Sequence, residues 1–216
     1  MKKFAKWSIV MMIMLVIATA CSSNESSKEK EVDLGKVESG TYTNEYFGIS
    51  LKLPEAWIVQ DAETINELNE AGKEVIAGDD EEKKKDLDIA EQKTLNLLTI
   101  SKEPLGSDEA NPNLFILAEK VSLLQGIKTS GDYLAALQKM LTDSQLPYTF
   151  GESSTVKIGG KEFEVIEATL DAGEIVVSQK YYSALVDGYA LSLAATYFDE
   201  ASKAEMDKII ADIKIK

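Results

Sequence analysis

Three short turn-forming sequences divide the second half of the chain into consecutive β-strands. They are Gly159-Gly160, residues 171–173 and Asp187-Gly188. Glycine and aspartate tolerate the positive φ angles that tight hairpin turns require, and such turns join only antiparallel neighbours. This part of the chain is therefore expected to form an antiparallel meander. The expected strands are residues 155–158, 161–170, 174–186 and 189–198.

Helical periodicity marks three segments that can cover such a sheet. In each segment, apolar residues recur three or four positions apart, and an Asp, Ser or Thr side chain can cap the first turn. These helices are expected at residues 61–76, from Thr129 or Ser130 onward, and from Asp199 or Ser202 onward. Apolar runs predict further strands at residues 48–53, 94–101 and 114–121. The fold class is therefore α+β, with an antiparallel β-sheet covered by helices.

The amino terminus has a pattern typical of exported proteins. Lys2, Lys3 and Lys6 precede an apolar stretch at residues 7–17. A membrane-spanning helix needs roughly 20 apolar residues. This stretch is shorter, which is typical of a signal peptide. The sequence that follows, Ala18-Thr19-Ala20-Cys21, places small residues directly before the single cysteine. It resembles the lipobox of bacterial lipoproteins.

The lipobox resemblance implies a lipid anchor. Residues 1–20 would be a signal peptide that is cleaved between Ala20 and Cys21. The Cys21 thiol would then carry diacylglycerol, and the new amino group a further acyl chain such as palmitate. Two or more acyl chains hold a protein stably at a membrane. The alternatives are an uncleaved anchor and ordinary cleavage after Ala20 without lipid.

A polar segment separates Cys21 from the expected domain. Residues 22–40 are rich in Ser, Glu and Lys and show no apolar period. Such a segment buries too little apolar surface to offset the entropy lost on ordering it. We therefore expect residues 21–40 to be the lipidated Cys and a flexible tether, and residues 41–216 to be a single domain. The alternative is that part of residues 32–37 forms a helix or a strand.

The charge and the missing residue types exclude several functions. The formal net charge is -14, which repels nucleic acid. The sequence contains neither histidine nor arginine, so it lacks the commonest general base and the bidentate anion-binding side chain. These absences favour a non-enzymatic binding protein without a cofactor or a metal.

Both ends of the expected domain resemble the PsbP/Mog1/DcrB-like superfamily. Residues 46–57 run tyrosine, small turn, alternating strand, proline and, three positions later, tryptophan. At the other end, a hairpin at residues 187–189 leads into an apolar strand, a helix and residues 213–215. Over residues 41–215 the resemblance implies an antiparallel sheet with helices on both sides. It implies no set of functional residues, and the charged residues 78–91 have no counterpart in it.

Two candidate chemistries do not fit their context. Ser154 and Lys157 repeat the S-x-x-K spacing of penicillin-binding proteins, and residues 128–130 resemble their K-T-G. Ser154 and Lys157 fall on an expected strand, however, where such positions face opposite sides. Carboxylates between Asp79 and Asp88 offer oxygen ligands for a weak Ca²⁺ site, but lysines interrupt them. A solvated charged surface is the simpler interpretation.

The candidate contact surface for a partner is aromatic. Tyr181 and Tyr182 are neighbours on an expected strand, so one faces the core and the other points away from it. The outward ring is the candidate contact, because tyrosine combines a large apolar body with a polar tip. Trp57, directly after a strand, is expected in the core.

These observations favour a membrane-anchored accessory module on the extracytoplasmic face of a bacterial cell membrane. Its N-terminal lipid would hold it at the membrane, and its expected partner is a protein of the cell envelope. Lysine without arginine and the lack of a disulfide are consistent with a Gram-positive source. The alternative function is the capture of a small molecule or a cation.

Overall fold

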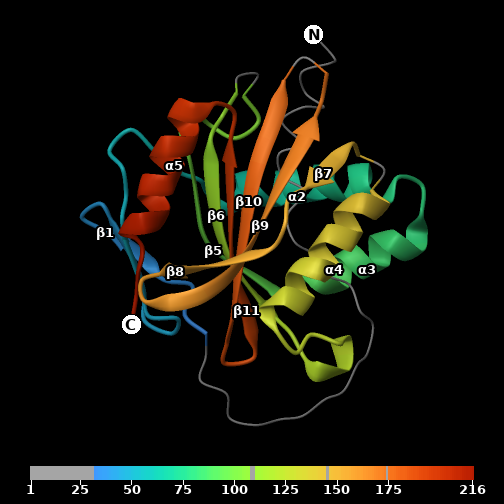
Figure 1. Cartoon of the computed structure of the whole chain (residues 1–216), viewed down its shortest axis with the longest axis horizontal. Coiled ribbons are helices and arrows are strands. Elements are labelled where there is room, and N and C mark those ends of the chain that lie inside the picture. Colours follow the sequence, from blue (N-terminus) through green and yellow to red (C-terminus); the bar gives the residue numbers. More distant parts are fainter. Residues whose placement is uncertain (1–31, 108–109, 145, 174) are drawn as a thin grey trace.

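The computed structural model describes residues 32–107, 110–144, 146–173 and 175–216. The predictions for the signal peptide, for Ala20 and Cys21, and for the start of the tether therefore lie outside the described residues. The described chain forms a main antiparallel sheet and a smaller one, with helices on both sides of the main sheet (Figure 1). This arrangement confirms the expected α+β fold class.

The main sheet is antiparallel throughout, as the hairpin signals predicted. Its central strand, β11, is buried at every position, because both faces of the sheet are covered. The order across the sheet is β4 (Ile58–Val59), β5 (Thr94–Ser101), β6 (Asn113–Lys120), β11 (Tyr189–Tyr197), β10 (Val176–Val186), β9 (Lys161–Asp171) and β7 (Tyr148–Phe150), and β8 (Ser154–Ile158) also pairs with β9. The turns at Gly159-Gly160 and Asp187-Gly188 join β8 to β9 and β10 to β11.

The small sheet begins inside the expected tether. Its order is β1 (Lys36–Glu38), β2 (Thr41–Asn44), β3 (Ile49–Lys52) and β12 (Lys214–Ile215). The prediction that residues 32–40 belong to a flexible tether is therefore wrong. The side chains of β1 are exposed, and the segment is ordered by hydrogen bonds instead: Asn44 Nδ2 donates to Asp33 O at 2.6 Å, and Tyr42 Oη donates to Leu34 O at 3.0 Å. Apolar periodicity does not report hydrogen bonds of this kind.

The closing strand of the small sheet, β12, lies very close to two glycines. Lys216 N donates to Gly48 O at 3.1 Å, and Gly159 forms a bridge with Lys214. A Cβ atom on Gly48 would lie 2.5 Å from Lys216 O, and one on Gly159 would lie 2.3 Å from Ile215 N. Both glycines also have positive φ angles. A side chain at either position would therefore clash with β12 and would also strain the backbone.

The helices begin where the capping residues predicted. The expected caps Asp61, Thr129 and Asp199 each accept a backbone N–H of the first turn. The helices are α2 (Ala62–Ala77), α3 (Glu81–Glu91), α4 (Ser130–Asp143), α5 (Glu200–Asp212) and the short 3₁₀ helix η1 (Leu123–Gln125). Across the described ranges, none of these helices has the length and apolar content needed to cross a membrane.

The charged helix α3 is fixed to α2 by a half-buried lysine. Lys73 Nζ lies 2.6 Å from Glu70, 2.9 Å from Asp88 and 2.5 Å from Glu91. Burial alone lowers the pKa of Lys73, but the three carboxylates outweigh it and raise the pKa above the ordinary value. Asp88 and Glu91 of the charged region thus connect α3 to α2 through ion pairs with Lys73.

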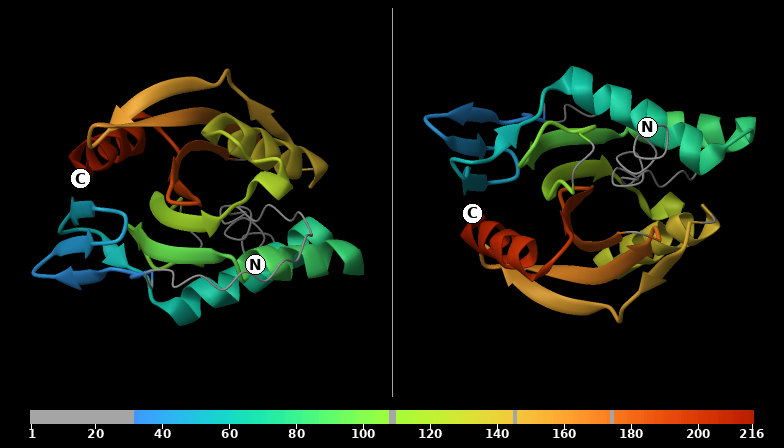
Figure 2. Two further views of the ribbon diagram at one scale, coloured as in Figure 1. Left: turned by 90° about the horizontal axis from the view of Figure 1, so that it is seen from below. Right: turned by 90° about the horizontal axis from the view of Figure 1, so that it is seen from above.

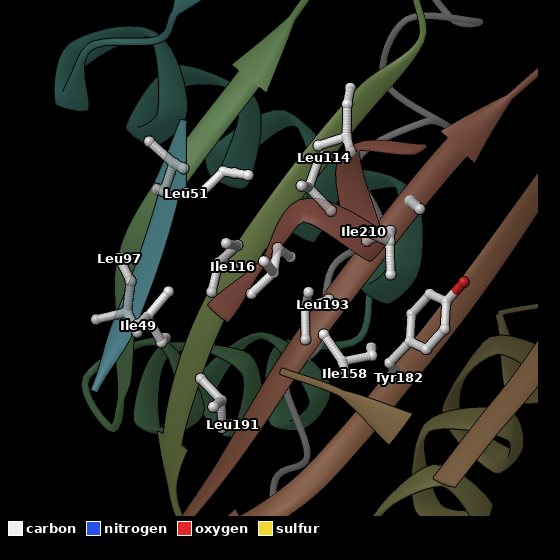
Figure 3. Close-up of a cluster of buried hydrophobic side chains, with 14 of the residues drawn as sticks. Ile49, Leu51, Leu97, Leu114, Ile116, Ile158, Tyr182, Leu191, Leu193 and Ile210 are labelled. Atoms are coloured by element: carbon white, nitrogen blue, oxygen red, sulfur yellow. The ribbon is translucent and has the colours of Figure 1, made fainter. Parts of the chain in front are cut away.

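Two apolar clusters cover the two faces of the main sheet. Cluster 1 lies between the sheet, the small sheet and α5, and includes Leu51, Leu193 and Ile210 (Figure 3). Cluster 2 lies on the other face against α2 and α4. The views in Figure 2 show α5 and the small sheet at one side of the molecule, and α3 and α4 at the other. Trp57 is buried in cluster 1, as predicted.

Candidate functional site

A cleft of about 240 Å³ lies between the edge strands of the two sheets. Its walls come from β1, β2, β4, β5 and the first turns of α2, so segments far apart in the sequence meet here. We call it the edge cleft, and its lining includes Lys36, Val37, Tyr42, Val59, Gln60, Ile65, Asn96, Leu97 and Leu98.

Both edge strands beside the cleft carry exposed apolar side chains. In the sheets as described, β4 pairs only with β5, and β1 pairs only with β2. Val37 and Val59 line the cleft and are 43% and 42% exposed, and Leu34 and Ile58 beside them are equally open to solvent. An exposed apolar edge is a template for pairing with another strand, and proteins usually protect it with charge or proline.

A β-bulge shapes the floor of the cleft. The register between β5 and β6 shifts between Asn96 and Leu98, which turns the side chains of β5 locally. Thr99 Oγ1 donates to Asn96 Oδ1 at 3.1 Å and so fixes the amide. Asn96 Nδ2 is buried and has no hydrogen-bond partner among the described residues. This amide donor is closed off from solvent, so it does not offer a hydrogen bond to a group bound in the cleft.

The remaining polar groups of the cleft are held in place. Burial raises the pKa of Tyr42 to about 12, so its hydroxyl stays protonated and donates to Leu34 O. Gln60 Nε2 donates to Ser101 Oγ at 2.8 Å, and Gln60 N donates to Thr99 O at 2.9 Å. These bonds fix the rim of the cleft at β4 and leave a preformed wall.

The size of the cleft limits what it can hold. Pockets for drug-sized ligands have volumes of roughly 300–1,000 Å³, and the edge cleft is smaller. Its volume suits one or two side chains of an extended peptide. Its lining contains two titratable side chains, Lys36 and Tyr42.

Tyr181 and Tyr182 do not form a contact surface. The prediction that one ring points away from the core is wrong, because Tyr181 is 1% and Tyr182 5% exposed. Tyr182 packs in cluster 1, whereas Tyr181 packs in cluster 2 beneath α4. Neighbouring residues of a strand alternate between core and solvent only where one face of the sheet is exposed to water. Both faces of β10 are covered, so both neighbours are buried.

The strings that resemble penicillin-binding proteins serve structural roles. Asp132 Oδ2 accepts the backbone N–H groups of Lys128 and Thr129 at 2.9 Å and 2.8 Å, and the Thr129 side chain caps α4. Residues 128–130 line a second, polar cleft of about 320 Å³ together with Glu162 and Glu164. Ser154 and Lys157 lie on β8, paired with β9.

The acidic residues of the charged region do not gather into a cation site. Asp80 caps α3, and Asp88 pairs with Lys73. Within the described residues, no group of three or more potential metal ligands is arranged to hold an ion.

The edge cleft could not be recognised from the sequence. It depends on β1, which lies in a stretch without an apolar period, and on a bulge that no turn residue marks. The signals present in the sequence were Leu34 and Val37, which are apolar residues in a polar segment.

Comparison with known proteins supports the fold. No protein-family model and no curated protein matches this chain. Among solved structures, cyanobacterial PsbP (CyanoP) from Synechocystis sp. PCC 6803 has a TM-score of 0.50 at 12% identity, and the match covers 84% of this chain and 96% of that one. The fold is PsbP-like. This confirms the fold that the resemblance implied, and at such low identity it shows the fold alone.

A second solved structure comes from a cell envelope protein. LpqN, described as involved in cell envelope biogenesis of Mycobacterium tuberculosis, has a TM-score of 0.45 at 14% identity, and the match covers 78% of this chain and 83% of that one.

Proposed function

We propose that this protein is a lipid-anchored, non-enzymatic accessory module on the extracytoplasmic face of a bacterial membrane, and that it docks an extended segment of an envelope protein. The lipobox-like sequence that ends in Cys21 supports the anchor. The edge cleft is the observation that carries the docking function. It combines open strand edges, exposed apolar side chains and a small preformed cavity.

Strand addition explains why these features occur together. An extended peptide that pairs with an edge strand gains main-chain hydrogen bonds, and pockets for its alternate side chains give specificity. The edges of β1 and β4 offer the main-chain groups, and the cavity between Val37 and Val59 takes one apolar side chain.

Site-specific cross-linking tests this function in the full chain. A photo-reactive amino acid replaces Val59 in the lipidated protein within its native membranes. The matched control is Val176, which is 48% exposed at the far end of β10. We expect a discrete protein adduct from position 59 and none from position 176. Equal labelling from the two positions would contradict the proposal.

Two variants separate docking from anchoring. Val59→Lys places a charge at the strand edge, which opposes pairing, and should remove the adduct from a photo-reactive residue at position 37 without lowering the melting temperature. Cys21→Ser should release the protein from the acylated pool, as measured by the mass of the N-terminal peptide. An unmodified N-terminal peptide in the parent chain would contradict the anchor and leave the docking test valid.

A further inference from the structure

The main chain of β4 is open at Val59. Gln60 N donates to Thr99 O at 2.9 Å, and the register places Val59 opposite Ile100. Consecutive residues of an antiparallel strand send their main-chain N–H and C=O groups alternately to one side and to the other. Because Gln60 bonds towards β5, the N–H and C=O of Val59 point away from β5. They therefore face the open edge, where no strand of the described chain pairs with β4.

The main chain of β1 is open at Val37 for a similar reason. A two-residue turn, Ser39-Gly40, joins β1 to β2, and both of its φ angles are positive. Such a turn closes on a hydrogen-bonded pair, which here is Glu38 and Thr41. The next pair, Val37 and Tyr42, is consequently the one without main-chain hydrogen bonds. The N–H and C=O of Val37 therefore point away from β2.

Among the described residues, each edge offers one such pair of groups. The preceding N–H on the open side of each strand is already used, since Trp57 N donates to Pro54 O at 3.1 Å and Gly35 N donates to Asp33 Oδ1 at 2.9 Å. Beyond the open pair, β4 leads into the cap of α2 and β1 into its turn. In an extended chain, one residue can bond to one edge and the next residue to the other, so a short segment satisfies both.

The surroundings of the cleft are acidic. The segments that carry its lining residues, 33–42, 59–66 and 96–99, contain one lysine and four carboxylates. Lys36 Nζ lies 3.1 Å from Glu38, which balances the charge of this lysine. Asp33 lies close enough to Tyr42 for its charge to contribute to the raised pKa of that hydroxyl. A cationic segment is therefore attracted to the cleft, whereas a second copy of this chain, with a net charge of -14, is repelled.

The segment that precedes the described residues does not suit the cleft. Residues 22–31 contain no apolar side chain. They gain nothing by entering a cavity whose lining includes Val37, Val59 and Leu98. An occupant that fits both the charge and the lining must come from another protein.

We propose that the edge cleft holds a short extended segment of an envelope protein in which a lysine or arginine adjoins a small apolar residue. The segment lies between β1 and β4. One of its residues pairs with Val59, the next pairs with Val37, and the apolar side chain enters the cavity. This inference rests on the proposed function, because that function supplies an envelope protein as the partner.

Synthetic peptides test the pairing on the purified, lipidated full chain in detergent. The probe is the capped, fluorescein-labelled peptide Lys-Val-Lys-Val-Lys, and fluorescence anisotropy measures its binding. Two further probes carry N-methyl groups on the valines or on the lysines, which removes the N–H donors for one edge at unchanged charge. We expect each methylated probe to bind about fivefold more weakly. A probe with glutamate in place of lysine should bind about tenfold more weakly.

A proline variant tests the protein side of the same contact. Val59→Pro removes the outward N–H of β4 and leaves the hydrogen bonds between β4 and β5 intact. The matched control is Thr155→Pro on β8, an exposed edge position whose N–H points away from β9. We expect Val59→Pro to weaken binding of the unmethylated probe about fivefold. Thr155→Pro should leave the binding unchanged, and both variants should keep the melting temperature of the parent chain.

Other results would overturn the inference in distinguishable ways. Equal binding of the methylated and unmethylated probes would mean that charge alone attracts the peptide. A loss from only one methylated probe would mean that the segment pairs with one strand and does not lie between two. A dimer in sedimentation experiments that the probe dissociates would mean that a second copy of the chain occupies the cleft.

The cross-linking in native membranes separates this inference from the proposed function. An adduct from position 59 without any binding of the probes would overturn this inference alone. Binding of the probes as expected, without an adduct from position 59, would overturn the envelope partner and therefore the proposed function.

Discussion

The two faces of the main sheet are stabilised in different ways. Towards α5 and the small sheet, β6, β10 and β11 present mainly apolar side chains, among them Ile116, Tyr182 and Leu193. Towards α2 and α4, the same strands also bury polar side chains between apolar ones. These polar residues are Asn113, Glu119, Gln179, Ser183, Ser192 and Thr196.

The polar face positions α4 through hydrogen bonds. Tyr133 of α4 donates to Glu119 Oε2 at 2.9 Å, and burial raises the pKa of Tyr133 well above its ordinary value. Further along, Gln179 Oε1 accepts from Tyr181 at 2.8 Å and from Tyr148 at 3.1 Å. Apolar contact tolerates small shifts, whereas buried polar pairs require defined geometry. The comparison thus separates an apolar layer from a layer whose register is fixed by polar contacts.

The largest loss of stability is expected from the apolar face. Phe163 is fully buried in cluster 1, so Phe163→Ala leaves a cavity and lowers the free energy of unfolding by about 3–5 kcal/mol. Urea denaturation measures this change. A loss below about 1 kcal/mol would show that cluster 1 adjusts around the cavity and is not closely packed.

On the polar face, removal of a single hydroxyl group is expected to lower the free energy of unfolding considerably. Tyr133→Phe removes one hydroxyl and takes a hydrogen bond from a buried carboxylate, which costs about 1.5–3 kcal/mol. The measurement is again urea denaturation. An unchanged midpoint would mean that the bond to Glu119 does not help to hold α4 on the sheet.

Adjacent tyrosines on β10 compare the two faces directly. Tyr181→Phe loses the bond to Gln179, at a cost of about 1 kcal/mol. Tyr182→Phe should cost less than about 0.5 kcal/mol, because its hydroxyl makes no hydrogen bond to a described residue. Parallel thermal melts of both variants test the difference, and equal losses would refute the distinction between the faces.

A further effect concerns the rim of cluster 1 and depends on pH. Glu205 accepts from Trp57 Nε1 at 2.9 Å and pairs with Lys102 at 2.6 Å. Burial alone raises the pKa of Glu205, but Lys102 and Trp57 outweigh it and lower the pKa below the ordinary 4.5. The stabilisation is complete above about pH 4.5 and is lost as the pH falls through the lowered folded-state pKa.

The Glu205→Gln variant should therefore be less stable than the parent chain at pH 7, by about 0.5–1 kcal/mol. The difference should shrink below pH 4.5. Urea denaturation at pH 7 and pH 3.5 measures it, and a difference that does not change with pH would rule out the charge of Glu205 as its cause.

The fold was largely predictable because its signals are local. The strand expected at residues 94–101 is β5 as observed, and Asp61 caps α2 as expected. Strand order is different, because nothing in the sequence places β6 beside β11 or β12 beside β3. The strands β1 and β7 were not predicted, because each is three residues long and too short to show an alternating apolar pattern.

The edge cleft was less predictable than the fold. Its wall at β1 is ordered by Asn44 and Tyr42, whose partners Asp33 and Leu34 lie in a polar segment. The error at Tyr181 and Tyr182 has a related cause, since the alternation of a strand identifies its two faces but does not reveal what covers them.

The pairing of β12 with β3 also affects when the domain can finish folding. Ile215 pairs with Ile49, 166 residues earlier in the chain. If the chain is exported from its amino terminus, β1, β2 and β3 emerge first but stay an incomplete sheet until residues 214–215 follow. The wall that β1 and β2 give to the edge cleft therefore gains its support late, after almost all of the domain has been delivered. A newly exported chain would complete its edge cleft only at the end of folding.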